Sequence, residues 1–141
     1  MKNWRTVLCV LFFLSISIGC AGNPNKVDIP KDAAKMAVSF SWQGIAPCTH
    51  DSPEIEVSNI PGGTKWFKIR LTNLSIPEEN HGGGKIENDG SGRIPPMALD
   101  IGYNGPCPTE GRNTYEFFVL ALDEQETIIG FGSAKQPFPP K

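Results

Sequence analysis

Clusters of basic residues are absent from this chain. Its 141 residues include 13 lysines and arginines, which are scattered among 15 aspartates and glutamates and leave a formal net charge of −2 at pH 7. A surface that binds nucleic acid needs basic residues gathered in one place. The composition therefore predicts a protein without a nucleic-acid partner.

A catalytic nucleophile motif and a metal-binding motif are also missing. The sequence contains no Gly-x-Ser-x-Gly, so a triad of Ser52, His81 and Asp51 would lack the strained turn that activates such a serine. The possible zinc ligands His50, His81, Cys48 and Cys107 have spacings that match no structural zinc site. We expect no enzymatic activity, no cofactor and no bound metal.

No segment has the 3.6-residue apolar period of a long helix. Several short segments instead alternate between apolar and polar residues or are rich in aromatic and branched residues, which is typical of strands. These segments are 38–42, 55–58, 66–71, 115–122 and 127–134. Together with 13 prolines and 15 glycines, they predict an all-β (mainly β) sandwich with at most short peripheral helices, one turn of which we expect at 32–36.

The longest apolar run, Val7 to Ile18, lies at the start of the chain. Lys2 and Arg5 precede it and small residues follow it, which is the pattern of a secretory signal peptide. The run is too short to span a bilayer as a mature helix. Its end, Gly19-Cys20, resembles a bacterial lipobox, in which the cysteine is lipidated and becomes the new N-terminus. The alternative is ordinary cleavage that leaves a soluble secreted or periplasmic protein.

The chain is accordingly divided into three parts. Residues 1–19 are the predicted signal peptide, residues 20–36 a polar tether that follows a lipidated Cys20, and residues 37–141 one domain. We expect an exported protein held at a membrane by this lipid. In a cell with two membranes we expect the outer one, facing the periplasm, because Ala21 and Gly22 are not the acidic residue that retains lipoproteins at the inner membrane.

Two cysteines, Cys48 and Cys107, lie in the predicted domain. An even pair in an exported chain suggests a disulfide. Two buried thiols, or one reactive thiol, are the alternatives. We predict the disulfide.

The segment 77–96 has no clear period and contains His81 and the run Gly82–Lys85. A stretch of this length is usually either functional or a mobile surface loop, and both interpretations stay open. The glycine run has neither the spacing nor the Ser or Thr of a nucleotide-binding phosphate loop.

Two runs about fifty residues apart carry a family resemblance. The first is Asp51–Ile55, followed by Ile60–Lys65, and the second is Tyr103–Pro108, followed by Tyr115–Phe117 and Ala121–Asp123. In this order the chain resembles the phosphatidylethanolamine-binding family, in its bacterial Raf kinase inhibitor-like branch. The resemblance implies a β-sandwich with small peripheral helices and an anion pocket at one end, in agreement with the predicted strands.

The resemblance also implies pocket residues by position. Asn73 stands where the family has an aspartate, His81 is placed like the family's first pocket histidine, and Asn113 stands near the position of its second. The residues that match or replace pocket positions are Asn73, His81, Tyr103, Gly105, Pro106 and Asn113. Because Asn73 and Ser75 stand where the family usually has two aspartates, and one histidine is also replaced, such a pocket would hold a ligand mainly through amide and hydroxyl groups.

The sequence therefore predicts a non-catalytic exported lipoprotein that binds a small anion, a phospholipid headgroup or a peptide. The alternative is an interaction or inhibitor protein that has a protein partner and a vestigial pocket. If His81 contacts the ligand together with Tyr103, binding should strengthen as the pH falls, because histidine becomes a cationic donor in mild acid.

Overall fold

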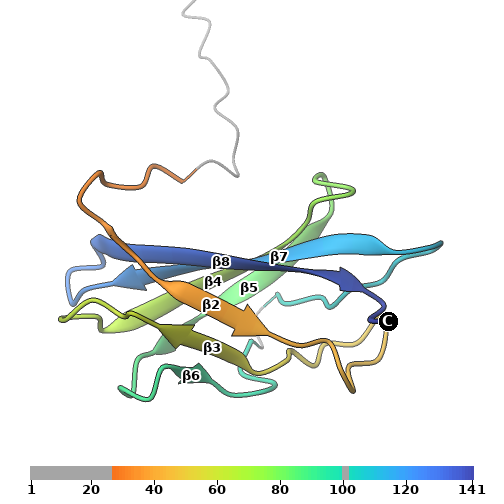
Figure 1. The fold of residues 1–141 in the computed structure, drawn as a ribbon, viewed down its shortest axis with the longest axis horizontal. Coiled ribbons are helices and arrows are strands. Elements are labelled where there is room, and N and C mark those ends of the chain that lie inside the picture. Colours follow the sequence, from red (N-terminus) through yellow and green to blue (C-terminus); the bar gives the residue numbers. More distant parts are fainter. Residues whose placement is uncertain (1–26, 100–101) are drawn as a thin grey trace, which may run out of the picture.

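The computed structural model describes residues 27–99 and 102–141, and every regular element in them is a strand (Figure 1). The predicted mainly β fold is confirmed. The strands are β1 (Ala34–Lys35), β2 (Ala37–Phe40), β3 (Ile55–Ser58), β4 (Trp66–Asn73), β5 (Asn80–Glu87), β6 (Arg93–Ile94), β7 (Asn113–Leu122) and β8 (Ile128–Phe138). Within these described ranges, no helix is long and apolar enough to cross a membrane.

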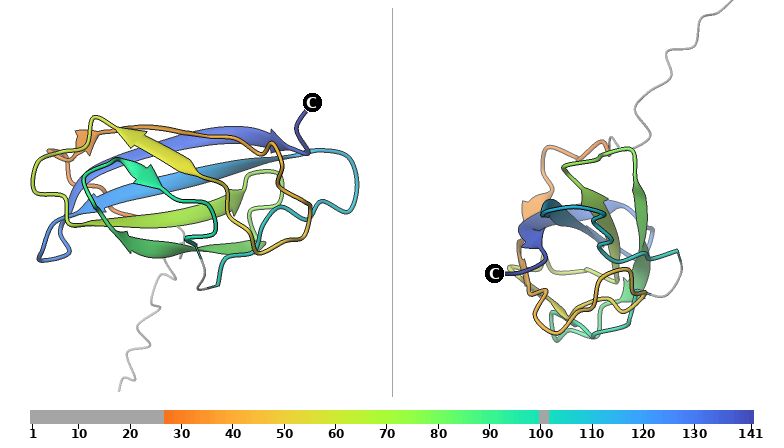
Figure 2. Two further views of the ribbon diagram at one scale, coloured as in Figure 1. Left: turned by 90° about the horizontal axis from the view of Figure 1, so that it is seen from below. Right: turned by 90° about the vertical axis from the view of Figure 1, so that its right-hand side faces the viewer.

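The strands form two sheets. The larger has the order β1-β8-β7-β4-β5 and the smaller the order β2-β3-β6. All neighbours are antiparallel except β1, which runs parallel to β8. Seen end-on in the right panel of Figure 2, the two sheets enclose the space that the core side chains fill.

Alternation along the strands builds the core between the sheets. Phe67, Ile69 and Leu71 of β4 are all buried, as the predicted alternation requires, whereas Lys68 between them is exposed. In the middle of the core, aromatic rings from both sheets meet edge to face at centroid distances of 4.8–6.1 Å, and these rings belong to Phe40, Trp42, Tyr115, Phe117 and Phe138. Such contacts add about 0.5–1.5 kcal/mol per pair to the free energy of burial.

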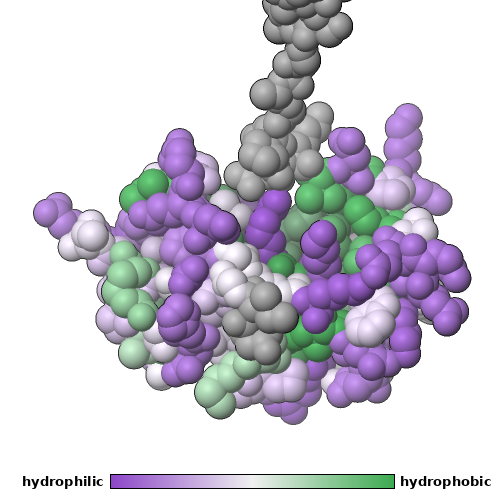
Figure 3. Space-filling model, turned by 180° about the vertical axis from the view of Figure 1, so that it is seen from behind, coloured by the Kyte–Doolittle hydropathy of each residue, from purple (hydrophilic) through white to green (hydrophobic). Residues whose placement is uncertain are grey.

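On the outer face of the larger sheet, long cationic side chains lie over aromatic ones. The Lys85 ammonium is 4.7 Å from the centre of the Trp66 ring, and the Arg70 guanidinium is 5.8 Å from that of Phe118. Seen from behind, the surface of the molecule has hydrophobic residues lying among hydrophilic ones (Figure 3). The aliphatic parts of the Lys85 and Arg70 side chains can cover apolar surface while their charged ends stay in water.

The structure excludes one interpretation of the segment 77–96 and shows that the prediction for 32–36 is wrong. The segment 77–96 is not a loop throughout, because it contains β5, which pairs with β4 along most of its length, and the short β6. The segment 32–36 forms no helical turn. It contains β1, whose Ala34 and Lys35 pair with Gly130 and Phe131 of β8, so sheet pairing begins inside the predicted tether.

The predicted signal peptide, residues 1–19, and the lipidation site Cys20 lie outside the described residues. The same holds for the first part of the tether.

Candidate functional site

The predicted disulfide between Cys48 and Cys107 is present, with the two Cα atoms 4.4 Å apart. Backbone hydrogen bonds run beside it. The Cys48 amide donates to the Pro106 carbonyl at 2.8 Å, and the Gly105 amide donates to the Thr49 carbonyl at 2.9 Å. The disulfide and these two bonds fix the segment 103–107 against the chain at 48–49.

Gly105 and Pro106, two of the predicted site residues, have structural roles in this segment. A Cβ atom at Gly105 would lie 2.6 Å from the Thr49 carbonyl oxygen, so only glycine fits there without a shift of the backbone. Pro106 is buried and supplies the carbonyl that Cys48 binds. Both residues would be needed in this loop whether or not a ligand binds.

Tyr103 is 2% exposed and stacks on Phe117, with the ring centres 6.4 Å apart and the planes at 10°. Its hydroxyl is buried and has no hydrogen-bond partner among the described residues. Burial, and secondarily the charge of Asp51, raises the pKa of this hydroxyl. Tyr103 therefore presents an uncharged group to the core, and its backbone carbonyl accepts a bond from His50 Nδ1 at 2.9 Å.

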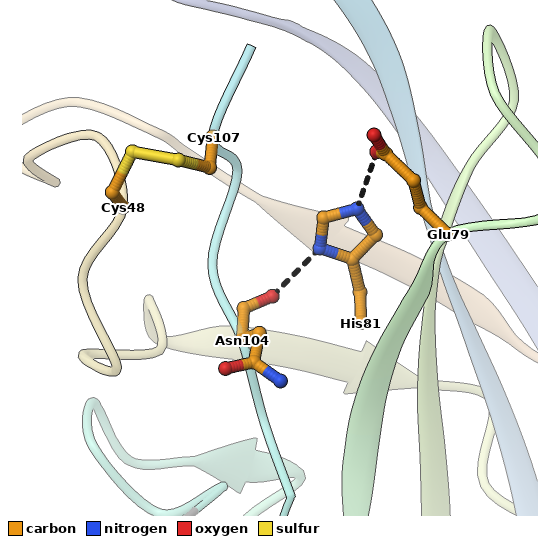
Figure 4. The surroundings of a disulfide bond; sticks show 5 residues. All are labelled: Cys48, Glu79, His81, Asn104 and Cys107. Atoms are coloured by element: carbon orange, nitrogen blue, oxygen red, sulfur yellow. Dashed lines mark hydrogen bonds and ion pairs between the residues drawn. A yellow bond between two sulfur atoms is a disulfide. The ribbon is translucent and has the colours of Figure 1, made fainter. Parts of the chain in front are cut away.

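His81 lies on β5 and is 6% exposed, so it is not a residue of a mobile surface loop. Its ring stands edge-on to Tyr115 at 5.3 Å. Nδ1 is 2.9 Å from the Asn104 carbonyl oxygen and Nε2 is 3.2 Å from Glu79 Oε2 (Figure 4). Both neighbours are acceptors, so only the protonated ring, with a proton on each nitrogen, can donate to both.

Asn73 ends β4 and is completely buried. Its Nδ2 donates to Glu79 Oε2 at 2.8 Å, while its Oδ1 accepts the backbone amides of Ser75 and Ile76 at 3.0 and 3.3 Å. The Asn73 side chain thus uses both its amide donor and its carbonyl acceptor. An aspartate here would lose the donor and would place a second negative charge beside Glu79.

Glu79 joins the two predicted site residues Asn73 and His81. Its Oε2 accepts from both of them, although its side chain is 46% exposed. The hydrogen bond from Asn73, and next that from His81, lowers the pKa of the Glu79 carboxyl. Sequence reasoning missed this residue, yet its spacing was a signal, because side chains two positions apart in extended chain point the same way.

Asn113 begins β7, and Tyr115, two residues further along this strand, is fully buried. Burial raises the pKa of the Tyr115 hydroxyl, which has no hydrogen-bond partner among the described residues. The Tyr115 ring stands edge-on to His81. Tyr115 therefore packs against the cluster, whereas no described hydrogen bond joins Asn113 to it.

The two donors of the cluster are buried, since Asn73 is 0% and His81 is 6% exposed. Five hollows of about 300–490 Å³ are described on residues 27–99 and 102–141, and none is lined by Asn73, His81, Tyr103 or Asn113. One of about 320 Å³ adjoins the cluster, because Glu79 lines it together with Arg70 and Glu78. Glu79 therefore lies between two buried donors and an open surface.

A metal site does not form around the cluster, since the described part of the chain has no group of three or more His, Cys, Asp or Glu side chains that could hold an ion. What the cluster offers is two side-chain donors aimed at one oxygen. This is the chemistry of oxyanion binding.

Comparison with known proteins supports the fold. No protein-family model and no curated protein matches the sequence. Among solved structures, one from Chlamydia trachomatis, described as a homologue of phosphatidylethanolamine-binding protein, has a TM-score of 0.50 and 15% identity over 78% of this chain and 99% of that chain. Escherichia coli YbcL, described as a member of the mammalian family, has a TM-score of 0.49 and 16% identity over 65% and 82%. The first of these likenesses shows that the chain has the phosphatidylethanolamine-binding-protein fold, as its sequence motifs predicted.

Proposed function

We propose that this is an exported, non-catalytic binding protein that holds a small oxyanion, such as a phosphate, a phospholipid headgroup or the carboxylate of a peptide. The observation that carries the proposal is the meeting of Asn73 Nδ2 and His81 Nε2 at one carboxylate oxygen, at 2.8 and 3.2 Å. Both donors are buried and lie on the paired strands β4 and β5, and charge-assisted bonds of this kind are among the stronger ones in proteins.

The surrounding residues would hold the donors in place. The Asn104 carbonyl orients the His81 ring, and the Asn104 amide also donates to the His81 carbonyl at 3.0 Å. Asn104 belongs to the segment that the Cys48–Cys107 disulfide fixes, and Figure 4 shows the disulfide beside this loop. In this proposal Tyr103, Gly105 and Pro106 support the loop rather than contact the ligand.

His81→Ala should weaken binding of phosphate or phosphoethanolamine. The alanine side chain offers no donor at the position of His81 Nε2, so the anion would lose one of its two side-chain hydrogen bonds. One such bond is worth about 1–2 kcal/mol, or roughly five- to thirtyfold in affinity. Isothermal titration calorimetry of the two proteins in the same buffer measures the effect.

Lys85→Ala is the matched control for charge, because Lys85 lies on the same strand and pairs with Glu126 over the outer face. It should leave the affinity within about twofold of the wild type, as expected for an exposed charge outside the site. Equal affinities for wild type and His81→Ala would exclude the proposed site.

One observation favours a second candidate, an interaction or inhibitor protein with a vestigial pocket. The donors of the cluster already have partners within the chain, and no hollow described on the surface is lined by them. Such a protein would bind a protein partner, and phosphate-type ligands would not change its stability. The calorimetric comparison above separates the two candidates.

We also propose that the protein is held at the outer membrane through a lipid on Cys20, on the strength of the apolar run and Gly19-Cys20 that follows it. Cys20→Ser should move the protein from the membrane fraction to the soluble fraction. Cys9→Ser, within the apolar run, is the control and should leave fractionation unchanged. If Cys20→Ser also stays with the membrane, ordinary secretion or another mode of attachment describes the protein better.

A further inference from the structure

We propose that Glu79 is a built-in occupant of the oxyanion position and that a ligand must displace its carboxylate in order to bind. This inference rests on the proposed function, because it takes the meeting point of Asn73 and His81 as the ligand's position. The structure shows that point already filled by an oxygen of the protein itself, Glu79 Oε2.

The two donors and the carboxylate are held very differently. The side chains of Asn73 and His81 are buried, and each has a second anchor: Asn73 Oδ1 accepts two backbone amides, and His81 Nδ1 binds the Asn104 carbonyl. The Glu79 side chain is 46% exposed and makes both of its hydrogen bonds through one oxygen. Turning Glu79 outward would therefore leave the donors in place.

The surface beside Glu79 gives a ligand a way in. Glu79, Glu78 and Arg70 are among the residues that line the hollow of about 320 Å³. The hollow therefore carries one guanidinium beside two carboxylates, and the attraction for an anion comes from the two donors that Glu79 now occupies. The site would thus accept a phosphate or carboxylate group whose oxygen can replace Oε2, and it would disfavour neutral ligands.

Displacement of this kind has a measurable consequence. The apparent affinity of a ligand is reduced by the fraction of molecules in which its position is already occupied. Removing the carboxylate should therefore tighten binding, whereas most substitutions in a binding site weaken it. The expected gain is on the order of tenfold, because hydrogen bonds that involve a charged group are worth about that factor or more.

The experiment is calorimetric titration of the full chain with inorganic phosphate at pH 7, using wild type and three variants. Glu79→Ala should bind about tenfold more tightly than the wild type. Glu79→Gln should fall between them, because its amide oxygen still accepts from Asn73 and His81 but carries no charge. Glu78→Ala removes the same charge from the same hollow without breaking a described hydrogen bond, and it should stay within about twofold of the wild type.

The outcomes separate this inference from the proposed function. Phosphate binding to none of the four proteins would overturn both. Equal affinities for wild type, Glu79→Gln and Glu79→Ala would overturn the displacement proposal alone. Equal gains in affinity for Glu79→Ala and Glu78→Ala would also overturn it, because they would indicate a general effect of removing a negative charge. If Glu79→Ala does not fold, because the buried Asn73 amide loses its partner, Glu79→Gln decides the question: a gain of threefold or more supports displacement, and no gain overturns it.

Discussion

Replacing Cys48 and Cys107 by serine in the same chain should lower the free energy of unfolding by about 4 kcal/mol. The disulfide joins residues 59 positions apart, and the chain-entropy model gives about 3 kcal/mol for a 15-residue loop and about 4.7 kcal/mol for a 100-residue loop. The total free energy of unfolding of a small domain is only about 5–15 kcal/mol. Urea unfolding followed by tryptophan fluorescence measures the loss.

Chemical reduction of the wild type is the matched control for this variant. Both cysteines are exposed, so a small phosphine should reach the disulfide in the folded protein and should bring the wild type to the stability of the double variant. The site should also respond, because the disulfide fixes the segment that carries Asn104. A double serine variant as stable as the oxidised wild type would show that the hydrogen bonds of Cys48 and Gly105 suffice to close the loop.

Gly82→Ala should destabilise the protein by about 4 kcal/mol. Gly82 follows His81 on β5 with a φ of +63°, and a Cβ atom there would lie 1.7 Å from the Gly102 carbonyl oxygen. A left-handed alanine costs about 1–2 kcal/mol, and a forced overlap in a packed region adds about 1–3 kcal/mol. The atom in the way is backbone, so the segment that begins at Gly102 and carries Asn104 would have to move away from His81.

Gly90→Ala separates these two contributions. Gly90 has a φ of +85°, but no atom lies within 4 Å of the position that its Cβ would take. The free energy of unfolding of this variant should therefore fall by only about 1–2 kcal/mol. Equal losses for Gly82→Ala and Gly90→Ala in urea unfolding would mean that the close approach of the 102–104 segment to β5 is not tight in solution.

The sequence allowed most of the larger sheet to be predicted. In β4 the side chains of Phe67, Ile69 and Leu71 are apolar and alternate with charged ones, so the period is visible. In β5 three successive glycines, Gly82 to Gly84, carry no side chains that could show a period. Those glycines are explained by close contacts, such as the 2.9 Å between a Cβ at Gly84 and Leu99 Cδ2, and such contacts depend on the folded chain.

The site could be predicted only in part, because some of its contacts also depend on how the chain folds. Asn73 and His81 were named from the family resemblance, and the structure brings them to one oxygen. Glu79 looked like an ordinary charged residue in a loop, because its importance depends on a partner that comes from β4. Tyr103 looked like a ligand contact, but its ring is buried in the core and stacks on Phe117, an orientation that its motif does not encode.

The measurement that tests the proposed oxyanion site most directly is a crystal structure of the protein at saturating phosphate. A phosphate oxygen should lie within hydrogen-bond distance of both Asn73 Nδ2 and His81 Nε2, with the Glu79 carboxylate turned out to the surface, while the Asn104 carbonyl still binds His81. The account is contradicted if Glu79 Oε2 keeps both of its hydrogen bonds at saturating phosphate, or if the phosphate binds elsewhere and leaves Asn73 and His81 unchanged.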